Sequence, residues 1–226
     1  MSTWSSLLAG IGETDCEQLG DGLLAQPVNA LTSTAYAAIG VAILALTRRL
    51  RERRGESILF GLLLIGVGVG SVLFHGPQPA GSKALHDLPI ALAGLLMLLH
   101  DVAVLRPSER TLGRFAVVAS VVAVAGLAVP AIVPPVAALV LASVGVLEVV
   151  IVRGGRRPVR RPTERRLLAA MAALAVVGGA SWVLGRSGAP LCDPDAVAQP
   201  HGLWHVLSGL VFGTWWWLAY VEADRR

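Results

Sequence analysis

The chain has 226 residues, of which 54% are hydrophobic and only 15% charged, with a formal net charge of +4. This composition is far too apolar for an ordinary soluble domain, and it predicts a protein whose helices cross a membrane. The positive charge is concentrated in a few arginine-rich connections, where it suits anionic lipid head groups and does not indicate a nucleic-acid-binding protein.

Seven apolar runs follow an N-terminal segment, residues 1–27, which lacks the cationic start and apolar core of a cleaved signal peptide. Each run is close to the ~20 residues that a membrane-spanning helix needs. We expect Pro134 and Pro135 to separate the fourth and fifth runs, because two prolines in a row stop a helix. The predicted fold is an all-α seven-transmembrane helix bundle forming a single domain, residues 1–226, with spans at 28–47, 57–75, 84–105, 113–132, 135–152, 166–185 and 201–221.

The arginines predict how this bundle is oriented. Alternate connections and the C-terminal tail hold 17 of the 19 basic residues, which leaves only Lys83 and Arg186 on the opposite side. By the positive-inside rule, residues 1–27 lie outside and the C-terminus lies in the cytoplasm. An odd number of spans likewise places the two termini on opposite sides. The tryptophans at 215–217 and Tyr220, near the end of the last span, fit an aromatic belt at the cytoplasmic interface.

Three of the five histidines fall at one end of the predicted bundle. His75 closes the second span, and His201 and His205 open the seventh, so this topology places all three at the outer face. Residues four apart share a helix face, and bundle metal sites draw their ligands from facing helices. A lone interfacial histidine is more often an ordinary hydrogen-bonded side chain. Three neutral imidazoles with an open fourth position, however, are the ligand set of a catalytic zinc, and ionisable groups are costly in a membrane.

Other polar residues lie at or near the same depth. Asp87 opens the third span, and Ser71 lies one turn, ~5.4 Å, deeper than the histidine that ends the second span. His86 is next to Asp87 but points about 100° away around the helix, so its part in a site stays open. His100 and Asp101 lie ~20 Å from Asp87 along the third span and cannot reach the same ion, so we interpret them as interfacial.

The N-terminal segment carries further chemistry. Cys16 and Cys192 are the only two cysteines, and both fall in outside segments, where disulfides persist, so we expect them to be bonded. Asp15, Glu17 and Asp21 offer the oxygen ligands that calcium prefers. An acidic segment that is simply solvated is an equal alternative.

Three stretches resemble the signature motifs of alkaline ceramidases: Gly68–His75 (GVGSVLFH), Asp87–Ile90 (DLPI) and His201–Gly209 (HGLWHVLSG). More broadly, they resemble the CREST superfamily of seven-span hydrolases, which also includes adiponectin-receptor-like proteins. Asp15–Glu17 followed by Pro27–Ser33 is similar to the ceramidase opening. The similarity is colinear across almost the whole chain, and the short motifs are specific in combination.

The resemblance implies a zinc ion held by His75, His201 and His205, with Ser71 and Asp87 beside the water that it binds. It also implies a disulfide between the two cysteines. Family members hydrolyse the amide of ceramides to a sphingoid base and a fatty acid, and in the eukaryotic enzymes an acidic N-terminal segment binds calcium. Asp15 and Glu17 are the candidate calcium ligands here.

Two positions depart from the family pattern. The ceramidase motif commonly has its aspartate three residues before the proline, where this chain has His86, while Asp87 lies two residues before it. Gln26 stands where the calcium-binding segment of the eukaryotic enzymes has a glutamate.

The sequence therefore predicts a zinc-dependent integral-membrane hydrolase that cleaves an N-acyl lipid to a free amine base and a fatty acid. Zinc lowers the pKa of bound water toward ~7, and Asp87 would accept its proton. Ser71 would donate a hydrogen bond to the oxyanion or to the zinc-bound water. One alternative is a receptor-like CREST member. The other is a metal transporter or sensor, which would need ligands at more than one depth. A composition rich in Ala, Gly, Val and Arg with a single lysine suggests a bacterial plasma membrane, with the active site near its outer face.

Overall fold

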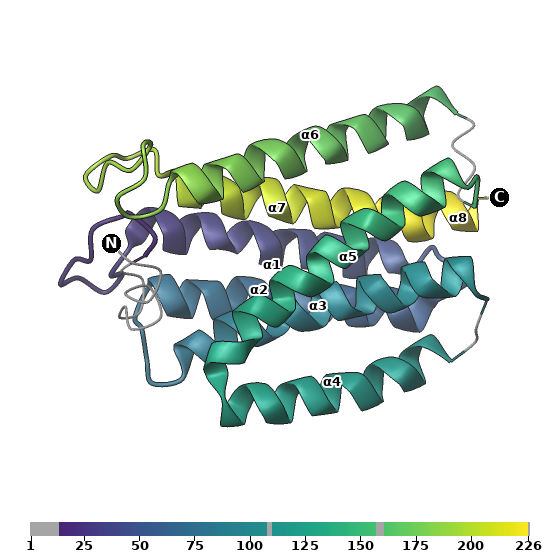
Figure 1. Cartoon of the computed structure of the whole chain (residues 1–226), viewed down its shortest axis with the longest axis horizontal. Helices are drawn as coiled ribbons and strands as arrows, with labels where there is room; N and C mark the ends of the chain where they lie inside the picture. Colours follow the sequence, from purple (N-terminus) through teal and green to yellow (C-terminus); the bar gives the residue numbers. More distant parts are fainter. Residues whose placement is uncertain (1–13, 108–109, 157–160, 226) are drawn as a thin grey trace.

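The computed structural model describes residues 14–107, 110–156 and 161–225, and all regular elements in these ranges are helices. The long helices run roughly along one direction, with α4 and α6 at opposite edges and α5 crossing obliquely (Figure 1). Their bounds are α1 Pro27–Thr47, α2 Arg54–His75, α3 Ser82–Leu105, α4 Thr111–Ala128, α5 Val133–Arg153, α6 Pro162–Leu184 and α7 Pro200–Trp216. The structure also has three short helical elements, which are the 3₁₀ turn η2 (Pro130–Ile132), the π-helical turn η3 (Trp217–Val221) and α8 (Glu222–Asp224).

Each predicted apolar run forms a helix. In the described ranges, six helices are long and apolar enough to cross a membrane, which makes the chain a multi-pass membrane protein by length and composition. The seventh, α7, has 17 residues, and η3 and α8 extend it without interruption to Asp224. We call the end where α2 finishes and α7 begins the histidine end, and the opposite end the arginine end.

The boundary between α4 and α5 differs from the expectation. Helix α4 already ends at Ala128, and Pro134 and Pro135 lie in the first turn of α5 instead of breaking the chain. The first turn of a helix has no intrahelical partner for its N–H groups, so proline costs nothing there and its fixed φ favours the helix. The two prolines therefore start a helix, and the break lies at Val129 and Pro130.

Glycines in α2 bring three helices close together at the histidine end. A methyl group on Gly68 would lie 2.7 Å from the backbone nitrogen of Ala37 in α1, and one on Gly70 would collide with the carbonyl oxygen of Leu85 in α3. Small residues of this kind let helix backbones approach in a membrane. They hold the second half of α2 against the middle of α1 and the start of α3.

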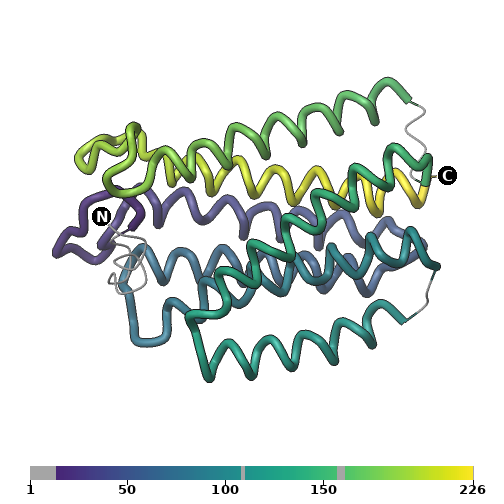
Figure 2. Tube along the Cα trace, in the orientation of Figure 1, coloured from purple at the N-terminus to yellow at the C-terminus, as the bar shows by residue number. Residues whose placement is uncertain are grey.

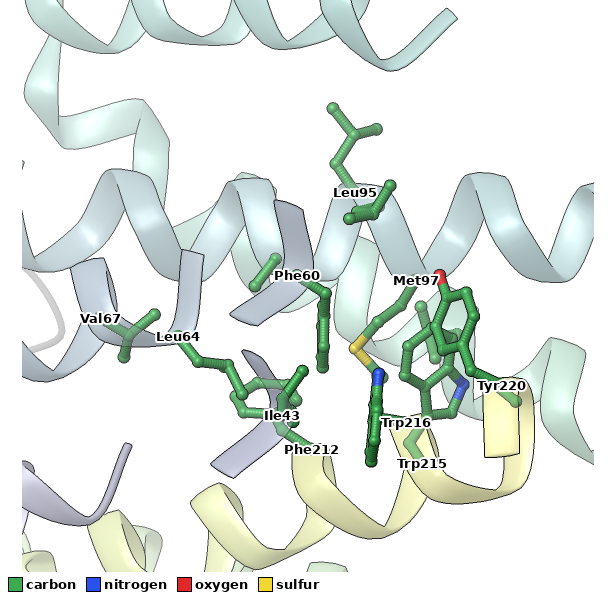
Figure 3. Packing of buried hydrophobic residues seen from close by; sticks show 14 of the residues in the cluster. Ile43, Phe60, Leu64, Val67, Leu95, Met97, Phe212, Trp215, Trp216 and Tyr220 are labelled. Atoms are coloured by element: carbon green, nitrogen blue, oxygen red, sulfur yellow. The ribbon is translucent and has the colours of Figure 1, made fainter. Parts of the chain in front are cut away.

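Helices α1 and α7 pack side by side although nearly the whole chain separates them (Figure 2). A core of large apolar side chains fills the space between α1, α2, α3 and α7 toward the arginine end (Figure 3). Trp215, Trp216 and Tyr220 are each no more than 3% exposed, so they belong to this core and not to an aromatic belt. The buried Nε1 groups of the two tryptophans donate to Glu148 and Ser57, at 2.9 and 2.7 Å.

Candidate metal centre

His75, His201 and His205 meet at the histidine end. Their ring centroids lie 4.6 to 5.1 Å apart, and one nitrogen of each ring falls within 4.8 Å of the other two. All three side chains are buried, in a layer where α1, α2 and α7 are in contact. The three histidines that were predicted to share one end of the bundle thus lie together in the structure.

Hydrogen bonds determine which nitrogen of His75 is free. Its Nδ1 lies 2.7 Å from Oε1 of Gln26, a carbonyl oxygen that can only accept, so Nδ1 carries the hydrogen. Its Nε2 is buried and has no hydrogen-bond partner in the described residues. This nitrogen therefore keeps its lone pair available for a ligand.

His205 has the same arrangement through two hydroxyl groups. Its Nδ1 lies 3.2 Å from the oxygens of Thr32 and Ser33. Those hydroxyls already donate to the backbone carbonyls of Val28 and Asn29, at 2.7 and 2.6 Å, so toward the ring they act as acceptors. Nε2 of His205 is again buried without a hydrogen-bond partner among the residues described.

The third ring faces a carboxylate. Nδ1 of His201 lies 3.7 Å from Oδ1 of Asp15, which is close enough for an electrostatic contact and too long for a hydrogen bond.

These residues fit a zinc ion. Buried polar atoms nearly always have partners, so two converging nitrogens without one indicate a place for a ligand. Neutral imidazoles are common zinc ligands at ~2.1 Å, and their second nitrogen typically donates to a carbonyl, carboxylate or similar acceptor. No other group of three His, Cys, Asp or Glu side chains in the described part of the chain comes this close together.

Local sequence explains why the ligands converge. Proline occupies the first position of both α1 and α7, where it favours a helix start. The segment before α1 pairs with the end of α2, because the backbone N–H of Gln26 donates to the carbonyl of His75 at 2.7 Å. That pairing sets the start of α1 beside the last turn of α2.

Ser71 reaches the site through Ser33. The two hydroxyl oxygens are 2.8 Å apart, and because the Ser33 hydrogen is used on Asn29, Ser71 is the donor of this pair. Ser71 is fully buried. Its predicted donation to an oxyanion would therefore require the hydroxyl to rotate away from Ser33.

Asp87 lies beside the histidine group without being part of it. Its Oδ1 is 2.7 Å from Nδ1 of His86, and its Oδ2 is 3.0 Å from Nζ of Lys83. The His86 ring stacks on Phe74, with centroids 4.7 Å apart, and lies 5.8 Å from the ring of His75. His86, whose part the sequence left open, thus contacts Asp87 and also lies near His75.

The N-terminal segment packs onto this site. Cys16 and Cys192 form a disulfide, as expected from their placement. Both carboxylate oxygens of Glu17 accept backbone N–H groups at the start of α1, from Val28 at 2.7 Å and Asn29 at 2.8 Å. Glu17 is therefore a helix cap, and the calcium site that includes it stays a prediction.

Sequence reasoning missed Gln26, Thr32 and Ser33 as site residues. Each lies in or next to the stretch that resembles the ceramidase opening, which was the available signal. Their roles became visible only when α1 was placed against α2 and α7.

The sequence model of the ceramidase family matches residues 21–226, which include the three histidines, Ser71 and Asp87. The chain belongs to the ceramidase family. Membership implies an amide hydrolase with a lipid substrate, and it does not favour the receptor-like alternative. No curated protein matches this ceramidase-family chain.

Proposed function

We propose that this ceramidase-family protein is a zinc-dependent hydrolase that cleaves an N-acyl lipid to a free amine base and a fatty acid. The observation that supports it most directly is the convergence of three buried histidines, two of them with an Nε2 that has no partner among the described residues. When bound, zinc supplies Lewis acidity and an activated water at neutral pH.

In this proposal Asp87 is the general base and later the general acid. The Lys83 ammonium and the His86 ring hold the carboxylate in place, and the His86 ring leads toward His75. Asp87 accepts a proton from the attacking water and returns it to the leaving amine. Ser71 turns its hydroxyl from Ser33 to the developing oxyanion.

An apolar cavity of about 610 Å³ supports a lipid substrate. It is lined by side chains of α3, α5, α6 and α7, among them Leu141, Met171 and Phe212. Tyr36 and Ser208 line it near the histidine end, where the Tyr36 ring lies 5.9 Å from the ring of His205. This size is typical of ligand pockets, and we assign the cavity to an acyl chain whose amide reaches the metal ligands.

We further propose a single domain of seven spans, with residues 1–27 outside and the C-terminus in the cytoplasm of a bacterium. The support is the arginine distribution, since 17 of the 19 basic residues lie in the connections and tail assigned to one side. The α7–η3–α8 continuation supplies the length for the seventh span. The active site then lies near the outer face of the plasma membrane.

The test is to purify the full chain in detergent and to measure zinc content together with hydrolysis of a short-chain ceramide. About one zinc per chain and release of the free base are expected. The host's own lipid extract is the second substrate, analysed for amide lipids lost and fatty acids gained. A protein that carries zinc but releases fatty acid from neither substrate would rule the proposal out.

A further inference from the structure

Gln26 is held by two contacts that fix the orientation of its amide. The side chain is fully buried, and its Nε2 donates to the backbone carbonyl of Glu17 at 2.7 Å. A carbonyl can only accept, so the NH₂ group must face Glu17 and the Oε1 must face His75, where it lies 2.7 Å from Nδ1. The amide therefore presents an acceptor, and not a donor, to the ring.

An acceptor at this place selects one tautomer of His75. The hydrogen is held on Nδ1, and the lone pair is left on Nε2, the buried nitrogen for which the described residues offer no hydrogen-bond partner. Without Gln26 the neutral ring is free to carry its hydrogen on Nε2, which cannot then bind a metal. Partners behind a ligating histidine typically change metal affinity by about 10–100-fold when they are lost.

We propose that Gln26 is a positioning residue of the metal site, and that the N-terminal segment carrying it is a built part of that site. The inference rests on the proposed function in one respect, which is that the three histidines bind zinc. Gln26 acts through His75, fixing its tautomer and ring orientation.

The segment is anchored on both sides of Gln26. The disulfide from Cys16 to Cys192 ties it to the connection before α7, and the Glu17 carboxylate caps the first turn of α1. Glu17 also supplies the carbonyl that holds the Gln26 amide. A short path of Cys16, Glu17 and Gln26 thus joins the disulfide to the metal ligand on α2.

The three ligands differ in what stands behind them. His205 is backed by neutral hydroxyls and His75 by a neutral amide, whereas His201 faces the Asp15 carboxylate at 3.7 Å. A carboxylate behind a ligating histidine raises its basicity more than an amide does. Replacing Gln26 by glutamate would add negative charge behind His75 and keep the acceptor.

Two variants isolate the contact to His75. Gln26→Met keeps the length of the side chain but removes both polar groups of the amide, whereas Gln26→Glu keeps an acceptor facing the ring and adds a negative charge. Both lose the bond to the Glu17 carbonyl, so the difference between them reports on the acceptor and its charge behind His75. Gln18→Ala, an exposed glutamine of the same segment, is the matched control.

The measurement is a competition titration of the purified full-length protein with zinc alone against a fluorescent chelator. We expect Gln26→Met to weaken zinc binding about 10–100-fold, Gln26→Glu to bind at least as tightly as the parent, and Gln18→Ala to match the parent. Thermal unfolding of each metal-free variant is recorded to compare the folds. Equal zinc affinity of Gln26→Met and Gln26→Glu, with both folded, overturns the proposal.

A second arm tests the anchor. In the Cys16→Ser, Cys192→Ser double variant the segment is no longer tied, and we expect weaker zinc binding than in the parent. In the same double variant, Gln26→Met should cost less affinity than it does in the parent, because the contact to His75 is already loosened. A full and additive effect of both changes would contradict the path from the disulfide to His75.

Hydrolysis assays on the same samples separate this inference from the proposed function. Zinc binding that depends on Gln26, in a protein that cleaves no N-acyl lipid, leaves the inference standing and removes the hydrolase. Hydrolysis and zinc affinity that are both unchanged in the two Gln26 variants leave the hydrolase standing and overturn the inference about Gln26. A parent protein that binds no zinc overturns both.

Discussion

Two buried polar clusters lie at opposite ends of the bundle, and they differ in which atoms are left open. At the histidine end, Nε2 of His75 and Nε2 of His205 are buried and have no hydrogen-bond partner in the described residues. At the arginine end, a single carboxylate oxygen of Glu56 is contacted by Arg53, His100 and Tyr220, at 3.3, 3.3 and 3.4 Å. Burial is similar in the two clusters. The open acceptors distinguish a candidate site from a structural network.

The arginine-end cluster also corrects an expectation. His100 and Asp101 are 2% and 0% exposed, so they are interior residues and not interfacial ones. The His100 ring packs against Trp215 and Tyr220, with centroids 5.4 and 4.8 Å apart. The π-helical turn at Trp217–Val221 widens the helix where Tyr220 reaches Glu56.

The largest difference between the two clusters is expected when histidines are replaced at each end. The His75→Ala, His201→Ala, His205→Ala variant is expected to lose its zinc and its hydrolysis of short-chain ceramide. His100→Ala should keep one zinc per chain, because His100 belongs to the arginine-end cluster and lies away from the three histidines. Metal analysis of the two purified variants is the measurement. Zinc retained by the triple variant would place the metal elsewhere.

Replacing Asp87, the carboxylate beside the site, should lower the rate of hydrolysis and leave zinc binding unchanged. Asp87→Asn is expected to lower kcat about 10²–10⁴-fold, the usual contribution of a general acid–base group, with zinc content unchanged. Asp101→Asn, on the same helix at the arginine end, is the matched control and should leave kcat of the folded protein near that of the parent. Undiminished hydrolysis by Asp87→Asn would remove Asp87 from the mechanism.

Disrupting the arginine-end cluster should lower the free energy of unfolding and leave the zinc affinity unchanged. Glu56→Ala leaves the buried His100 and Tyr220 without their shared acceptor, and we expect a loss of about 3 kcal/mol in the free energy of unfolding. Zinc affinity should stay within about twofold of the parent. Denaturant unfolding in detergent and the chelator titration check the two halves, and a large fall in zinc affinity would show that the clusters are coupled.

The smallest effect is expected behind His205. Ser33→Ala removes one of two hydroxyl acceptors of Nδ1 and also the partner of Ser71, while Thr32 keeps its contact. The loss of one hydrogen bond of this kind is worth about 1 kcal/mol, or roughly fivefold in zinc affinity. Ser143→Ala, at a partly exposed serine on α5, serves as control. If the two variants bind zinc equally, Ser33 does not support His205.

The helices and the metal ligands could be predicted because their signals are local. Long apolar runs stand out, and His201 and His205 share a face by spacing alone. Gln26 and Ser33 could not be found in this way, since their roles depend on how α1 rotates against α2 and α7. The burial of Trp215 and Trp216 could not be predicted for the same reason, because their position in the sequence does not say whether they face lipid or the core.

The disulfide has a consequence for how the protein matures. It joins residues separated by 176 positions, the first from the start of the described chain and the second from the connection before the last long helix. Two of the three candidate metal ligands also come from that last helix. A ribosome must therefore translate nearly the whole chain before the first and last parts can meet. If the three histidines bind zinc as proposed, the metal site is complete only after α7 has been made.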